Sequence, residues 1–391
     1  MSKRLGIVLV VVVVVTAVVF AMRPGKARSN QKAEHAVIFI IDGLSHKAVD
    51  KLPLNNLRGL IQTGSYCEKS YNILPAHFRT GAWAQYHTSS IPNPVILAGT
   101  VLLRTDQQYV QESFFPDRLT AHAANDIDYR RLNVGFNLTF LNGSGTNPVH
   151  DDQTIAWAMR FLREAHPAFM KVHLQDTGNA GVQCFREEKQ SVPWRQNIWA
   201  NGSPYVQAAI KADEYLGMFL RELKALGLAD KTVLFVTADH GQSDHGWHPF
   251  DDADACVMPL VVAGPGIRAG QKLAYAEQID IVPTLCYLSG VKPPANAAGR
   301  ILAEALTNPP SGVPQQTRSI PELNKVLLEG GQLIRKLQQD AEKSPAVREK
   351  LAMAERDFYG IERILEWHRF GSIEKLVEND RLVLQQLAPN K

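Results

Sequence analysis

The chain has 391 residues, a net charge of +3, and a composition that is 45% hydrophobic and 21% charged, which is the balance of a globular protein with a large core. Four cysteines are too few to staple a fold of this length, and the basic residues form no stripe, so the composition argues against a disulfide scaffold and against nucleic-acid binding. The length suits one large domain with additions, or two domains.

The N-terminal region contains an uncharged, Val-rich segment at residues 5–22. As a helix it would extend about 27 Å, which is enough to cross a hydrocarbon core. Basic residues flank it on both sides, so the charge pattern does not fix its orientation. We expect residues 1–28 to be a signal-anchor, with a signal peptide cleaved after Ala21 as the alternative. Either form predicts a protein that is membrane-anchored through residues 5–22 or exported to the periplasm or cell surface.

Four apolar, β-branched runs predict strands that are buried on both faces. Helical periodicity fills residues 152–164 and 205–226 between them. Strands that alternate with helices predict an α/β fold with a mostly parallel central sheet and helices on both faces. The predicted strands are Ala36–Ile41, Phe169–Leu174, Thr232–Thr237 and Met258–Ala263.

The pattern changes near residue 309, where a Pro- and Gly-rich linker begins, and we assign residues 34–308 to a catalytic domain and 309–391 to a linker and helical tail. Within the tail, Ser344 and Pro345 form an N-cap and a first helical position. Packing of these helices on the main domain is the favoured interpretation. A surface for oligomerisation or for a partner is the alternative.

The cysteines and the intervening loops complete this outline. The cysteines show no C-x-x-C spacing, so buried free thiols are expected, with one long-range disulfide as the alternative. Residues 104–125 and 184–203 are expected to form loops at the rim of the site. The four cysteines are Cys67, Cys184, Cys256 and Cys286.

Acidic side chains follow three of the predicted strands at the point where each strand ends. Asp42 follows the first strand, Asp176 the second, and Asp239 with His240 the third. Ligands of open parallel sheets bind beyond the carboxyl ends of the strands, so these side chains are expected to converge. Carboxylates held close together repel one another unless a cation neutralises them, and Asp with His suits Zn²⁺ or another divalent ion.

Together these motifs resemble the alkaline phosphatase superfamily, in its type I phosphodiesterase and sulfatase-like branch. The resemblance covers about residues 36–299, and it implies an alkaline phosphatase-like fold and a metal-dependent hydrolase. It rests on Ile41-Asp42-Gly43, Asn56-Leu57, Thr237-Ala238-Asp239-His240-Gly241, the segment from Met258 to Gly266, and the segment from Ile279 to Thr284.

The resemblance also implies a nucleophile. Members use a metal-bound Ser, Thr or modified Cys at the start of a helix, and Ser90 in Ser90-Ile-Pro-Asn-Pro is the matching position. Metal coordination and a helix N-terminus both favour the alkoxide over the weakly nucleophilic hydroxyl. Asn93 would donate a hydrogen bond to a phosphoryl oxygen. Thr88 and Ser89 are the alternative nucleophiles.

In two-metal members of the superfamily, one ion is held by the first strand-end Asp, the nucleophile and the Asp-His pair. Those roles fall here on Asp42, Ser90, Asp239 and His240, and all four residue types are present.

The second ion implied by the resemblance would take Asp176 and a later His, for which His248 is the best match and His245 the rival. Asn179 stands where a further His is expected, so this second ion should bind more weakly or be a harder metal. His173 is a candidate substitute, although the alternation of side chains along a strand argues against it.

From these features we predict a hydrolase of phosphate esters, with a small-molecule or lipid-linked substrate. Formylglycine sulfatases need Cys or Ser followed by x-Pro-x-Arg, and Ser90 lacks that arginine, so a sulfatase is the weaker alternative. A transferase of envelope headgroups would use the same chemistry. A non-catalytic scaffold with a decayed metal site is the alternative of another class.

Overall fold

The computed structural model describes residues 32–72, 79–90, 108–143, 149–249, 251–295, 297–313, 319–342, 344–359 and 373–387. The expected targeting segment at residues 1–28 and the predicted hydrogen-bond donor Asn93 lie outside these ranges. Within them, no helix combines the length and the apolarity needed to cross a bilayer.

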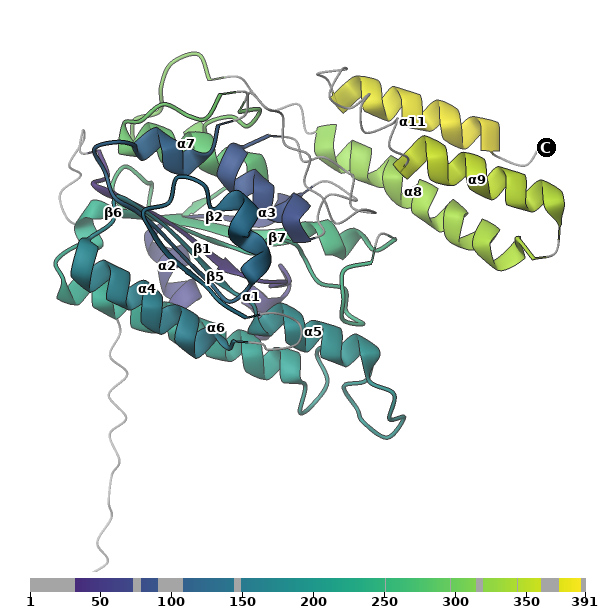
Figure 1. Cartoon of the computed structure of the whole chain (residues 1–391), viewed down its shortest axis with the longest axis horizontal. Coiled ribbons are helices and arrows are strands. Elements are labelled where there is room, and N and C mark those ends of the chain that lie inside the picture. Colours follow the sequence, from purple (N-terminus) through teal and green to yellow (C-terminus); the bar gives the residue numbers. More distant parts are fainter. Residues whose placement is uncertain are drawn as a thin grey trace, which may run out of the picture.

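A central sheet organises the main body, with the strand order β4-β3-β5-β1-β6-β7-β2-β8 and β9 paired to β2 (Figure 1). β1 lies in the middle and runs parallel to both β5 and β6. β7 runs antiparallel to β6 and to β2. The strands are β1 (His35–Ile41), β2 (Ser65–Tyr71), β3 (Thr120–Ala124), β4 (Leu138–Leu141), β5 (Phe169–Leu174), β6 (Thr232–Thr237), β7 (Val257–Ala263), β8 (Gln271–Lys272) and β9 (Ala276–Glu277).

Helices cover both faces of this sheet, and the described part of the tail contains α8, α9 and α11 (Figure 1). The helices are α1 (Ala48–Lys51), α2 (Asn55–Thr63), α3 (Arg79–Thr88), α4 (Asp151–Ala165), α5 (Asp176–Arg186), α6 (Pro204–Ala225), α7 (Ile281–Ser289), α8 (Ser319–Asp340), α9 (Pro345–Tyr359) and α11 (Ile373–Leu387).

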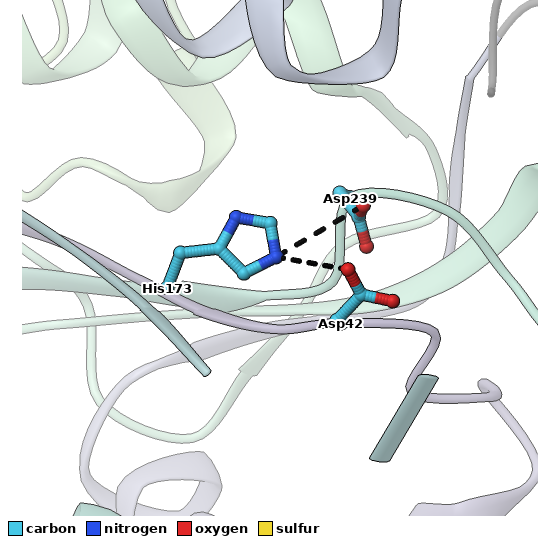
Figure 2. A group of neighbouring side chains, drawn as sticks. All are labelled: Asp42, His173 and Asp239. Atoms are coloured by element: carbon cyan, nitrogen blue, oxygen red, sulfur yellow. Dashed lines mark hydrogen bonds and ion pairs between the residues drawn. The ribbon is translucent and has the colours of Figure 1, made fainter. Parts of the chain in front are cut away.

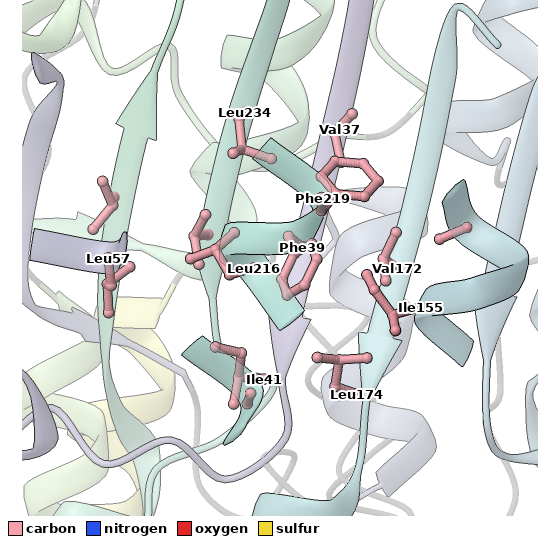
Figure 3. Packing of buried hydrophobic residues seen from close by; sticks show 14 of the residues in the cluster. Val37, Phe39, Ile41, Leu57, Ile155, Val172, Leu174, Leu216, Phe219 and Leu234 are labelled. Carbon is pink, nitrogen blue, oxygen red and sulfur yellow. The ribbon is translucent and has the colours of Figure 1, made fainter. Parts of the chain in front are cut away.

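The alternation of side chains along β1 divides the core into two layers. Val37, Phe39 and Ile41 face α2, α4 and α6, where Phe39 packs against Phe219 (Figure 3). Ile38 and Ile40 face the opposite way, into a second cluster with α3 and α7. A strand that is buried on both faces is apolar at every position, which explains why the sequence of β1 reads as an unbroken hydrophobic run.

The four strands predicted from sequence are present, and most of the strand pairs are parallel, as expected. The run at Met258–Ala263 belongs to β7, which is antiparallel rather than part of the parallel set. Five strands were not predicted, of which β4, β8 and β9 are only two to four residues long and β2 and β3 are longer. β2 has the polar sequence SYCEKSY, and β3 is the Ala-rich TAHAA inside the stretch at residues 104–125 that was expected to be a loop. Neither has the β-branched, apolar composition on which the prediction depended.

The tail helices pack against the main body through their own hydrophobic cluster. Ile320, Leu323 and Leu327 of α8 are buried together with Val257 and Ile279 of the main body. α9 begins at Pro345, directly after the expected N-cap. The four cysteines are buried and free, so the expectation of unpaired thiols is confirmed.

Candidate metal centre

Three side chains from neighbouring strands meet at one edge of the sheet. Asp42 directly follows β1, Asp239 lies two residues beyond β6, and His173 is the penultimate residue of β5. One ligand atom of each lies within 4.8 Å of the others. His173 Nε2 is 3.1 Å from Asp42 Oδ2 and 4.0 Å from Asp239 Oδ2, and its ring points toward both carboxylates (Figure 2). The predicted convergence of Asp42 and Asp239 is present in the structure.

His240 lies beside the same two carboxylates. Its Nε2 is 3.6 Å from Asp42 Oδ1 and 3.6 Å from Asp239 Oδ2. Its Nδ1 donates to the Gly241 carbonyl oxygen at 2.8 Å, so Nε2 is the ring nitrogen that faces the two carboxylates. The His248 ring packs on His240, with the ring centroids 3.8 Å apart.

Asp239 is buried and held by two donors. The Gly43 amide donates to its Oδ1 at 3.1 Å, and Trp83 Nε1 of α3 donates to its Oδ2 at 3.0 Å. Burial by itself raises the pKa of Asp239, but the neighbouring His240 and these two donors hold it below its usual range. The Asp239 carboxylate is therefore ionised.

His173 is neutral, because complete burial lowers its pKa to about 3. Its Nδ1 contacts the hydroxyl of Tyr129, which lies on the segment after β3. When Nδ1 carries the proton and donates to the Tyr129 oxygen, Nε2 offers its lone pair toward Asp42 and Asp239. Ionised carboxylates and neutral imidazoles are the protonation states that metal binding requires.

The first turns of α5 make room for the site. A Cβ on Gly178 would lie 1.8 Å from Asp42 Oδ1, so only glycine lets this carboxylate rest against the helix. A Cβ on Gly181, one turn further, would lie 1.8 Å from Gln242 Nε2. The Gln242 side chain is 1% exposed, and its amide makes no hydrogen bond among the described residues.

These donors fit a divalent cation. Two carboxylates and two imidazoles are a borderline-hard set of the kind that holds Zn²⁺, and the carboxylates also suit harder ions. Asp42, Asp239, His173 and His240 are the residues that could hold one ion here. A buried amide without a partner beside such a set is an additional sign that a ligand or water belongs in the space.

Asp176 lies at the end of β5 as expected, but it does not join this group. Its Oδ2 accepts from the Asp151 amide at 3.1 Å, and its Oδ1 is 3.2 Å from His150 Nδ1. Asp151 in turn accepts from the amides of Gln175 and Asp176, so each carboxylate caps the helix that the other begins. Burial and the nearby Asp176 raise the pKa of Asp151 to about 7.

Of the other residues predicted for a second ion, two are exposed and one is buried beside the centre. Asn179 lies on α5 with an exposed side chain, and His245 is exposed, with its Nδ1 3.0 Å from the Gln196 carbonyl. His248 is buried against His240 and stacks on Trp247. Of the two candidate histidines, only His248 contacts a residue of the centre, through the His240 ring.

Ser90 follows the C-terminal end of α3. Its Oγ is 2.7 Å from Thr88 Oγ1. Ser89 has a left-handed backbone, with φ of 54°, and its buried hydroxyl donates to the Ile279 carbonyl at 2.6 Å. The hydroxyl of Ser89 is therefore committed to the backbone, and Ser90 is the more accessible of the two serines.

Sequence reasoning missed two supporting residues and gave little weight to a third. Trp83 and Tyr129 lie in segments without a motif, so nothing in the sequence marked them. His173 is a candidate substitute ligand from the sequence, although alternation separates it from Asp176. It joins Asp42 instead, because β5 pairs with β1 and His173 lies opposite Ile40. The available signal was a histidine inside an otherwise apolar, buried strand.

Residues 99–291 match the family model described as Sulfatase. This range contains His173, Asp239 and His240, and it begins after Asp42 and Ser90. Among curated relatives, the ulvan-active sulfatase of Formosa agariphila is 29% identical over 136 residues, which cover 32% of this chain and 26% of that protein. Lipoteichoic acid synthase 1 of Bacillus subtilis is 30% identical over 99 residues, which cover 22% and 16%.

These alignments span about a quarter or less of the length of the relatives, so they compare only part of each protein. Among solved structures, the phosphonate monoester hydrolase of Silicibacter pomeroyi superposes with a TM-score of 0.54 at 17% identity, covering 72% of this chain and 78% of that one. The resemblance inferred from the motifs is confirmed to this extent: residues 99–291 match the Sulfatase family model, and the chain shares its fold with the phosphonate monoester hydrolase.

Proposed function

We propose that the chain is an exported or membrane-anchored, metal-dependent hydrolase of phosphate esters. The observation that carries this proposal is the meeting of Asp42, His173, Asp239 and His240 at one edge of the sheet. A purely structural role for these side chains would leave ionised carboxylates side by side in a buried site, which is costly without a cation.

Asp42, Asp239 and His240 would hold the cation, and Zn²⁺ is the ion that suits them best. When bound, a divalent cation would neutralise charge on the non-bridging oxygens of the ester and lower the pKa of a coordinated hydroxyl. Trp83 and Gly43 fix the Asp239 carboxylate through their two hydrogen bonds, so these donors position one wall of the site.

Ser90 is the proposed nucleophile. Its Oγ forms a bond to phosphorus as the bond from phosphorus to the alcohol oxygen breaks, and water then hydrolyses the phosphoseryl ester. The serine proton leaves to solvent and the departing alcohol takes one up, so the net change is the addition of water across the ester. Thr88 Oγ1, at 2.7 Å, is placed to orient the Ser90 hydroxyl.

The properties of the four cysteines favour a phosphate ester over a sulfate ester as the substrate. None of the four is followed by x-Pro-x-Arg, the sequence that the resemblance associates with formylglycine. All four are buried, and burial raises the thiol pKa of Cys67, Cys256 and Cys286 to about 12. No cysteine is therefore suited to act as a nucleophile. The similarity to a phosphonate monoester hydrolase fits diesters and phosphonate-like esters better than simple monoesters.

Sulfate ester hydrolysis is the second candidate, because the matching family model is described as Sulfatase and one relative is an ulvan-active sulfatase. The two candidates differ in one assay. The chain, supplied with Zn²⁺ or Mn²⁺, should hydrolyse bis(4-nitrophenyl) phosphate at least tenfold faster than 4-nitrophenyl sulfate. A preference for the sulfate ester would favour the second candidate.

The Asp239→Asn variant serves as the control in this assay, since it should lose turnover of either ester. Metal binding without turnover of either ester would support the non-catalytic scaffold instead. Transfer of the phosphoryl group to an added alcohol in preference to water would support the headgroup transferase, for which the similarity to a lipoteichoic acid synthase is the supporting observation.

A further inference from the structure

The tail helix α8 is connected to the metal centre by a short chain of buried hydrogen bonds. Asn324 of α8 donates from its Nδ2 to the Asn72 carbonyl at 2.7 Å and contacts Cys256 Sγ at 3.3 Å. Asn72, which directly follows β2, donates from its own Nδ2 to the Asp239 carbonyl at 3.0 Å. Asn72 is fully buried and Asn324 is 7% exposed, so water does not compete for these bonds.

Asn72 is held from two further directions. Its amide donates to the Cys256 carbonyl at 2.9 Å, and its Oδ1 accepts from Gln85 Nε2 of α3 at 2.5 Å. Asn72 thus joins α8, α3 and the start of β7 to the backbone of Asp239. Through Asn72, these elements are linked to a residue whose carboxylate would bind the cation.

A second contact of α8 restrains the neighbouring segment. Arg335 Nη1 forms an ion pair with Asp251 Oδ2 at 2.5 Å, three residues beyond His248. The other end of this segment is tied to the centre, because the Gly241 amide donates to the Ala255 carbonyl at 2.9 Å. α8 therefore contacts Asn72, which bonds to the Asp239 carbonyl, and Asp251, which lies three residues beyond His248.

We propose that α8 is a positioning element of the metal centre and that Asn324 acts through Asn72 to fix the backbone of Asp239. This inference rests on the proposed function, and it adds that the tail is required for tight metal binding. Residues that orient metal ligands without touching the metal typically change affinity by about 10–100-fold when they are replaced. The hydrophobic contacts of α8 would stabilise the fold, whereas the hydrogen bonds from Asn324 through Asn72 would hold the Asp239 backbone in place.

The test compares two neighbouring residues of the same helix. Asn324→Leu keeps the size of the side chain and removes the hydrogen bond to Asn72. Leu323→Ala removes a fully buried apolar side chain from the same interface without changing that bond. Zn²⁺ dissociation constants are measured in the full chain by competition with a chromophoric chelator, and melting temperatures of the zinc-free proteins are measured alongside.

We expect Asn324→Leu to weaken Zn²⁺ binding by about 10-fold or more. Leu323→Ala should lower the melting temperature and leave the dissociation constant within about 2-fold. If Asn324→Leu does not fold, Asn324→Ala takes its place, because it also lacks the donor and should weaken Zn²⁺ binding in the same way. Equal Zn²⁺ affinities of the parent and the Asn324 variants would overturn this inference and leave the proposed function standing. The same holds if the loss of affinity in the Asn324 and Leu323 variants is proportional to the fall in their melting temperatures. A parent chain that binds no divalent cation would contradict the proposed function as well.

Discussion

The ends of β6 and β5 provide a direct comparison, because each is followed by an aspartate and each strand is a parallel neighbour of β1. Beyond β6, Asp239 turns inward, is fully buried, and meets Asp42, His173 and His240. Beyond β5, Asp176 accepts hydrogen bonds from the N-terminus of α4 and lies near His150. Two equivalent positions in the topology therefore have different partners.

The backbone after each aspartate explains the difference. Asp176 is the first residue of α5, where a carboxylate finds the unpaired amides of nearby helix starts, and α4 begins beside it. Asp42 and Asp239 are instead followed by turns in irregular backbone, where Gly43 has φ of 61° and its amide reaches Asp239. A strand-end aspartate is thus a candidate ligand only when the next residues leave its carboxylate without a helix end to cap.

The strongest way to break this comparison is to neutralise each aspartate in turn. Asp239→Asn should lower kcat/KM for a phosphodiester by at least about 1000-fold and release the metal, because one anionic ligand is lost. Asp176→Asn should change metal content little and activity by less than about 10-fold, since an amide oxygen can still cap α4. Elemental analysis and steady-state kinetics measure both effects. Loss of a metal ion from the Asp176 variant would show that Asp176 is a ligand after all.

The two serines after α3 are also expected to differ in role, with Ser90 as the nucleophile and Ser89 as a structural donor. Ser90→Ala should lower turnover by about 1000-fold while the folded protein keeps most of its metal, because only the nucleophile is removed. Ser89→Ala should instead reduce stability by about 1–2 kcal/mol, because the buried Ile279 carbonyl loses its donor. Kinetics and chemical denaturation separate the two. Full activity in the Ser90 variant, with loss in Thr88→Val, would move the nucleophile to Thr88.

The glycines of α5 sharpen the account of Asp42. Gly178→Ala places a methyl group against the Asp42 carboxylate and should weaken metal binding by about 10-fold or more. Gly59→Ala in α2 is the matched control, because a Cβ there meets nothing within 4 Å. It should stabilise the protein by roughly 0.5–1 kcal/mol without changing metal affinity. A Gly178 variant with unchanged affinity would mean that Asp42 does not need its present position.

The smallest effect is expected at the capping pair. The pKa of Asp151 is raised in the folded state to about 7, so the folded protein favours the protonated form. Its contribution to stability is therefore complete below pH 4 and is lost as the pH rises through 7. Asp151→Asn should remove this dependence, so the variant should gain stability relative to the parent as the pH rises from 5 to 8. Melting temperatures across that range test it, and parallel curves for the two proteins would contradict it.

The sequence was sufficient to predict the strands that form the middle of the sheet and the residues at their ends. β1, β5 and β6 are buried on both faces, so their composition alone identifies them, and parallel strands bring Asp42 and Asp239 to the same edge. β2 and β3 could not be predicted in this way, because their polar or Ala-rich sequences become strands only through pairing with β7 and β5. Tertiary context decides such segments.

The limits of the site prediction have a similar physical origin. The alternation rule describes a single strand, and it correctly separated His173 from Asp176. It could not show that His173 would face Asp42, because that contact depends on the register between β5 and β1. Trp83 of α3 bonds to Asp239 across 156 residues of sequence. Asn324 of α8 bonds to Asn72 across 252 residues, and Asn72 bonds to Asp239 across 167. Contacts of this range leave no periodic pattern in the sequence.

Metal stoichiometry measured on the intact chain tests the central claim most directly. The protein is purified without chelators, dialysed against Zn²⁺ or Mn²⁺ and then against metal-free buffer, and analysed by mass spectrometry of the elements beside Asp239→Asn. We expect one tightly held ion per chain in the parent, with any second ion sub-stoichiometric, and none in the variant. A parent that retains no ion, or a variant that retains as much as the parent, would contradict a metal centre at Asp42, His173, Asp239 and His240.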